Sequence, residues 1–219
     1  MKLKEVNHVL SLSIVEQIAI LIISFIVGLL LFYVLSALNK EKKKLLIEHV
    51  LSYVVNFIIY MWLGKIITNI AGFIRDPFAI LAYPSDSKAF YVATLFIVIN
   101  IFIKERHKSS VTSLIAAFLP VFLFTSFTFE LIQVLYLNKS THFVYLLFLA
   151  CLVVSYLLFA EKLRKVASYL FFAVWSIGQF VLSIVQPFTT VFNYMLATSF
   201  FLLTSIGFMT LYIYYKDRC

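Results

Sequence analysis

The feature that most constrains this chain is a series of long apolar runs separated by short polar breaks. A helix needs about 20 apolar residues to cross the hydrocarbon core of a bilayer, and several of these runs reach or exceed that length. They cover residues 13–38, 45–67, 90–103, 111–137, 144–160, 166–186 and 191–215. We therefore predict an all-α, polytopic bundle of about seven transmembrane helices, with residues 1–219 forming a single transmembrane domain.

The overall composition agrees with a membrane protein. Hydrophobic residues make up 63% of the chain and charged residues 13%, against about 45–50% and about 25% in soluble domains. The net charge of +8 is spread over the short breaks between apolar runs instead of clustering on a polar domain. This is the pattern of membrane-flanking anchors and lipid contacts, and it argues against a nucleic-acid partner.

The distribution of basic residues predicts the orientation. With the N-terminus outside, twelve of the 18 Lys and Arg fall on the cytoplasmic side, and the other six fall outside. The excess favours an N-out, C-in topology, although Lys2 and Lys4 oppose it. We expect a multi-pass protein of the cell (plasma) membrane, in contact with the lipid bilayer. The composition, rich in Lys and Phe and poor in Gly, suggests a bacterial protein.

Residues 68–89 form the one sizeable loop and are predicted to lie at the outer face. Arg75-Asp76-Pro77 should end the preceding helix, because proline disfavours a helical residue before it. The apolar stretch that follows is too short to span, so we expect an interfacial or re-entrant segment. Arg75, Asp76, Asp86 and Lys88 are its candidate binding residues. The alternative is a plain amphipathic connector.

Glu130 is the most informative polar residue, because an ionisable group in hydrocarbon must be paired or must face a cavity. Ser126, Glu130 and Gln133 share one helix face by their spacing. Lys65 lies at a comparable depth in the predicted topology, so we expect it to neutralise Glu130, and Glu16 enters the membrane on the same side. These residues define a candidate intramembrane site for a lipid or small polar ligand. The alternative is interfacial snorkelling with one structural ion pair.

Polar and small residues also form stripes along two other helices. We expect them to act chiefly as packing contacts between helices, with a polar conduit as the alternative. The stripes consist of Glu48, Ser52, Asn56, Tyr60 and Gly64, and of Ser168, Ser176, Gln179, Ser183 and Gln186. Asn100 and Asn193 add one amide each to the third and seventh runs.

The sequence contains no recognisable catalytic, metal or nucleotide-binding motif. All four histidines, His8, His49, His107 and His142, lie at or beyond the ends of the runs, so haem ligation inside the bundle is not expected. The last run lacks the lysine that a retinal Schiff base would need. We therefore predict no cofactor and no metal, and we favour a non-enzyme.

Three hypotheses for function remain open. The first is a non-catalytic partner, assembly factor or regulator that binds another membrane protein through its helices and the 68–89 loop. The second is a small-solute or proton-coupled transporter that uses Glu130 and Lys65. The third is a lipid-modifying enzyme of the outer leaflet, with Glu130, Asp86 or His142 as acid or base.

Overall fold

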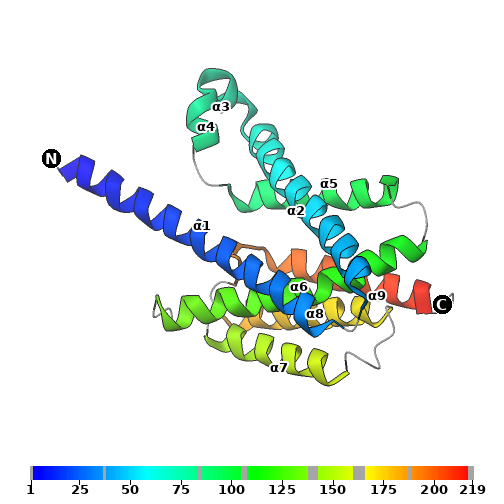
Figure 1. Cartoon of the computed structure of the whole chain (residues 1–219). Helices are drawn as coiled ribbons and strands as arrows, with labels where there is room; N and C mark the ends of the chain where they lie inside the picture. The colour runs from blue at the N-terminus through cyan, green and yellow to red at the C-terminus, as the bar shows by residue number, and fades with distance from the viewer. Residues whose placement is uncertain are drawn as a thin grey trace. The chain divides into compact units, whose positions relative to one another are not determined.

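The computed structural model describes the backbone of residues 2–36, 38–82, 85–104, 108–137, 143–159, 166–186 and 189–216, and the side chains of these residues except 2–14, 82 and 108–110. Nine α-helices and one small hairpin make up this described part (Figure 1). They are α1 (Lys2–Leu35), α2 (Lys40–Thr68), α3 (Ile70–Arg75), α4 (Pro77–Ala82), α5 (Ser87–Lys104), α6 (Lys108–Leu135), α7 (Phe143–Phe159), α8 (Ala167–Val185), β1 (Thr190–Val191), β2 (Tyr194–Met195) and α9 (Thr198–Lys216).

Six of the described helices are long and apolar enough to cross a membrane. The predicted all-α class is confirmed, and the number of spans is six or seven. The number depends on α7, which is apolar but has only 17 residues. At 1.5 Å per residue α7 is about 25 Å long, slightly less than the hydrocarbon core of about 30 Å.

The chain divides into two compact units. Unit 1 consists of Met1–Ala37 and Pro120–Lys162, and unit 2 consists of Leu38–Leu119 and Leu163–Cys219. The boundary falls inside α6, which continues through Pro120. The predicted single domain is not tested by this division, because one continuous helix belongs to both units.

In unit 1, α1 packs closely against the second half of α6. A Cβ atom added to Gly28 of α1 would lie 2.9 Å from the carbonyl oxygen of Val121 and would also collide with the side chain of Thr125. Phe124 of α6 makes an edge-to-face contact with Tyr156 of α7, with ring centroids 6.2 Å apart. Small residues such as Gly28 let helix backbones approach each other where lipid offers no hydrophobic driving force.

In unit 2, α2 packs against α5 through small and polar residues. A Cβ atom on Gly64 would lie 2.8 Å from the carbonyl oxygen of Ala89, which is itself fully buried. The amide of Asn100 donates a hydrogen bond to the hydroxyl of Tyr60. The expected packing role is therefore confirmed for Tyr60 and Gly64, and Asn100 joins them.

Aromatic rings hold α8 against α9, also in unit 2. Tyr169 stacks on Tyr215 with ring centroids 5.4 Å apart, and Phe172 stacks on Phe208 at 4.9 Å. The abundance of phenylalanine in the sequence thus supplies much of the contact between these two spans.

The seventh predicted run begins too early. We predicted a helix from residue 191, but residues 190–195 form the β1–β2 hairpin and α9 begins at Thr198. The hairpin turns at Phe192 and Asn193, whose φ angles of 50° and 67° cannot occur in a right-handed helix. Asparagine tolerates this backbone region better than most residues, and the β-branched pair before the turn favours a strand.

Residues 70–82 fold into two short helices, α3 and α4, beyond the end of α2 (Figure 1). α3 follows α2 after a break at Asn69, and α4 begins at Pro77. The predicted helix break at Arg75-Asp76-Pro77 is therefore present. We call residues 70–82 the α3–α4 hairpin.

Candidate functional site

Three polar side chains on the second half of α6 are almost completely buried. Ser126 is 2% exposed, Glu130 is 1% exposed and Gln133 is fully buried. Their spacing of four and three residues places them on one face of the helix. This α6 polar face coincides with the face that the sequence indicated, and it lies in unit 1.

Two of the three side chains of this face have polar atoms without a hydrogen-bond partner in the part of the chain that the structure describes. Both polar atoms of the Gln133 amide are buried without a hydrogen-bond partner there, and the same is true of the hydroxyls of Thr125 and Ser126. Buried polar groups normally form a hydrogen bond, and leaving such a group without a partner costs about 1–3 kcal/mol. The α6 polar face therefore has the donors and acceptors that a polar ligand, an ion or water would use.

The second candidate residue, Lys65, is 6% exposed near the C-terminal end of α2. Its Nζ donates a hydrogen bond of 3.2 Å to the carbonyl oxygen of Leu81 at the end of α4. Lys65 lies in unit 2 and Glu130 in unit 1, so their pairing stays a prediction.

The remaining intramembrane candidate, Glu16, is exposed on α1. Glu16 and Glu130 both belong to unit 1, but their environments differ, since only Glu130 is enclosed by protein. An exposed glutamate next to the start of the apolar span Val15–Leu35 is in a position to reach water at the membrane surface.

Two of the four outer-loop candidates have structural roles. Asp76 accepts a hydrogen bond of 3.0 Å from the backbone N–H of Ala79, and Asp86 accepts one of 2.9 Å from Ala89. Each carboxylate thus satisfies a free N–H group in the first turn of a helix, α4 or α5. The aspartate before Pro77 in the sequence is a recognisable capping signal that we did not use. The other two candidates, Arg75 and Lys88, are exposed.

A second buried polar group lies on α8 in unit 2. Ser176 and Gln179 are fully buried, and their side-chain polar atoms have no hydrogen-bond partner among the described residues. Ser183 in the same stripe bonds instead to the carbonyl oxygen of Phe180, at 2.7 Å. The stripe was visible in the sequence, but the sequence did not show which of its members would be enclosed.

Comparison with models of known protein families, with curated proteins and with solved structures found no match to this chain. The class that the fold defines is a multi-pass helical membrane protein with six candidate spans among its described helices. What such a protein does must be argued from its own side chains.

Proposed function

We propose that this membrane protein is a carrier that binds a small polar solute or a proton at the α6 polar face. The observation that supports the proposal is the full burial of the Gln133 amide beside the buried Glu130, with both amide atoms lacking a partner in the described structure. A carboxyl and an amide in a bilayer-spanning helix are costly to bury and are usually retained for a function.

The chemistry of the three residues fits this role. The carboxyl group of Glu130 can hold or release a proton, and the amide of Gln133 can both donate to and accept from a bound solute. The hydroxyl of Ser126 adds a further donor and acceptor one helical turn away. We further propose the N-out, C-in orientation in a bacterial cell membrane, which is supported by the basic residues around the described spans.

A hydrophobic carbodiimide provides a direct test of the carboxyl group. Such a reagent partitions into the bilayer and modifies carboxyl groups that are protonated and enclosed by apolar surroundings. We expect modification of Glu130, detected by mass spectrometry of the peptide. Glu48 is the matched control, because it also lies on a spanning helix but its side chain is 61% exposed beside Lys44. Equal modification of the two glutamates would contradict an enclosed, protonatable site.

Transport is tested with purified protein in liposomes that contain a pH-sensitive dye. We expect the native protein to dissipate an imposed pH difference, either alone or when polar solutes are added, and Glu130→Gln to lower the rate to that of empty liposomes. Glu48→Gln should retain the native rate. Undiminished transport by a folded Glu130→Gln protein would overturn the proposal.

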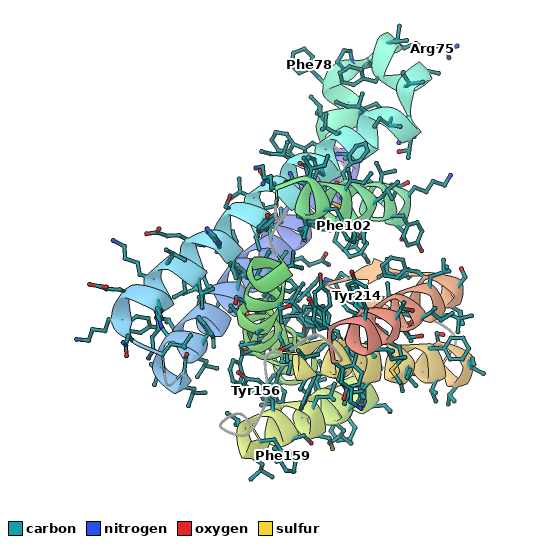
Figure 2. All side chains as sticks on the ribbon, turned by 90° about the vertical axis from the view of Figure 1, so that its right-hand side faces the viewer. Arg75, Phe78, Phe102, Tyr156, Phe159 and Tyr214 are labelled. Atoms are coloured by element: carbon teal, nitrogen blue, oxygen red, sulfur yellow. The ribbon has the colours of Figure 1, made fainter. Side chains whose placement is uncertain are left out.

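A non-catalytic membrane partner is the second candidate function. It is supported by α5, of which only Ala89 and Ala93 are buried. Between Lys88 and Lys104 the exposed side chains of this short span are apolar, as Phe102 and Ile103 illustrate at 66% and 65% exposure, and Figure 2 labels Phe102 on the α5 ribbon. A helix of another membrane protein could cover this face as well as lipid does.

Native mass spectrometry after gentle extraction distinguishes the two functions. A stoichiometric second protein would support the partner function. A chain that carries only lipid or a small molecule would support the carrier. For the third hypothesis, a lipid-modifying enzyme, Asp86 accepts a hydrogen bond at the start of α5, and His142 lies outside the described residues.

A further inference from the structure

The α3–α4 hairpin exposes large apolar side chains although it lies outside the candidate spans. Ile74 is 76% exposed and Phe78 is 84% exposed, the highest values among the exposed large hydrophobic residues of their respective helices. No residue of α3 is buried. An apolar patch next to charged residues normally marks a contact surface. The question is what covers this one.

The hairpin is held in a defined shape by contacts of its own. Gly72 of α3 faces Ile80 of α4 so closely that an added Cβ atom would lie 3.2 Å from the Ile80 side chain. Asp76 caps the start of α4, and Lys65 of α2 bonds to the carbonyl oxygen of Leu81 near its end. The exposed side chains of Ile74 and Phe78 therefore lie on a hairpin whose shape is fixed by its own contacts and by Lys65.

Exposed apolar residues continue along the chain from α2 onto the hairpin. Exposed aliphatic residues occur at 59, 63 and 67 on α2 and at 70 and 74 on α3, at intervals of three or four residues. This spacing keeps the residues of α2 on one side of that helix and those of α3 on one side of theirs, and the break at Asn69 separates the two helices. Because α2 is a candidate span, these exposed aliphatic residues follow the chain from the span onto the hairpin.

The charges of Arg75 and Asp76, at the bend between α3 and α4, limit how deeply the hairpin can enter the membrane. Arg75 ends α3 and is exposed, and Figure 2 shows the Arg75 and Phe78 side chains leaving the hairpin on different sides. A re-entrant hairpin would carry Arg75 and Asp76 into hydrocarbon at its tip, which is strongly unfavourable. Each helix has six residues and is about 9 Å long, comparable with a headgroup layer of about 5–8 Å on each side of the core.

We propose that the α3–α4 hairpin is an interfacial anchor in which Ile74 and Phe78 insert beside the acyl chains and Arg75 binds the phosphate of an anionic phospholipid. A guanidinium group suits a phosphate because it offers several N–H donors in one plane. The exposed guanidinium of Arg75 and the exposed apolar side chains beside it, next to the end of a candidate span, together select a lipid surface as the occupant. The inference does not depend on the carrier function.

The depth is tested with an environment-sensitive fluorophore on a single cysteine. Phe78→Cys is made in the full chain with Cys151 and Cys219 replaced by Ser, labelled, and reconstituted into phosphatidylcholine liposomes with added phosphatidylglycerol. Leu63→Cys, at an exposed site on the α2 span, is the hydrocarbon control. We expect the probe at 78 to be quenched most by a headgroup-attached spin label and the probe at 63 to be quenched most by a deep one.

Two outcomes of this experiment would overturn the anchor. Quenching of the probe at 78 by aqueous iodide, as for the free label, would place the hairpin in water. Strongest quenching by the deep label would make it re-entrant. If a second protein copurifies with the chain and shields position 78 in the native membrane but not in the purified state, this surface binds that protein instead of lipid.

The phosphate contact is tested in the same liposomes. We expect spin-labelled phosphatidylglycerol to quench the probe at 78 several-fold more than spin-labelled phosphatidylcholine, and the preference to weaken at high salt. Arg75→Gln should abolish the preference while leaving the depth unchanged, and Arg75→Lys should retain part of it. Lys88→Gln is the matched control for loss of one exposed charge. An unchanged preference in Arg75→Gln would refute the role of Arg75.

Discussion

Lys65 Nζ lies 3.2 Å from the carbonyl oxygen of Leu81, so a buried lysine at the end of α2 closes the C-terminal end of α4. The last carbonyl groups of a helix have no partner within it, and a cation placed there is favourable. The contact spans 16 residues of sequence. It joins the end of α4 to α2.

Replacement of Lys65 should therefore loosen the hairpin. We expect Lys65→Met to increase amide hydrogen exchange over residues 76–82 by roughly tenfold or more, because a hydrogen bond to a charged group contributes about 1.5–3 kcal/mol. Lys88→Met is the control, since Lys88 is exposed on the adjacent helix α5. The interpretation fails if exchange over 76–82 is the same in both variants.

Glycine substitutions should separate close helix packing from helix propensity. Gly28→Ala places a methyl group against Val121 and Thr125, so we expect a loss of about 1–3 kcal/mol of stability and a lower thermal midpoint. Gly207 of α9 has no atom within 4 Å of the added methyl group. Gly207→Ala should therefore leave the free energy of unfolding unchanged or raise it by up to about 1 kcal/mol, because alanine has the better helix propensity. The thermal midpoint should follow in the same direction. Equal effects of the two substitutions would contradict the α1–α6 contact.

Gln133→Leu should make the protein more stable and less active. Removing a buried amide without a partner relieves about 1–3 kcal/mol, and leucine has a similar volume. The thermal midpoint of the purified protein measures the gain, and the liposome assay measures the loss. The matched control is Gln17→Leu on the exposed side of α1, where neither quantity should change. A lower midpoint for Gln133→Leu would show that the amide is structural.

The burial of Tyr194 leads us to expect that the protein loses stability at high pH. Burial raises the pKa of the Tyr194 hydroxyl above its ordinary value of about 10. The folded protein then keeps this proton at a pH where the unfolded chain loses it, so the contribution is complete below about pH 10 and disappears as the pH rises through the pKa of folded Tyr194. We expect the thermal midpoint to fall less between about pH 9 and about pH 11 in Tyr194→Phe than in the native protein. Tyr214→Phe, at an exposed site, should keep the native dependence.

The spanning helices could be predicted from the sequence because lipid requires long apolar runs with internally bonded backbones. The start of α9 could not, because the β1–β2 hairpin depends on contacts with residues far away in the chain. The hydroxyl of Tyr91 accepts a hydrogen bond of 2.7 Å from the backbone N–H of Ala197, and Ser87 donates one to the carbonyl oxygen of Met195. Local apolarity, which the hairpin shares with α9, carries no information on such contacts.

For the site, helical spacing correctly grouped Ser126, Glu130 and Gln133, since period alone places residues on a face. The partner of Lys65 was not predictable. A backbone carbonyl has no sequence signature, and Leu81 reaches Lys65 only because the hairpin folds back on α2. Which polar residues of a stripe become enclosed likewise depends on neighbouring helices, as the contrast between Gln179 and Ser183 shows.

The division of unit 1 into Met1–Ala37 and Pro120–Lys162 has a consequence for biogenesis. At about 5–20 residues per second of synthesis, α1 leaves the ribosome on the order of ten seconds before the second half of α6 that it packs against. During that interval α1 must reside in lipid or at the insertion machinery without its own unit. The buried hydroxyl of Ser24 needs no partner from another helix during that time, because its Oγ donates a hydrogen bond of 2.7 Å to the carbonyl oxygen of Ile20 in the same helix. α1 can thus be stored in the membrane as an independent segment until its partners arrive.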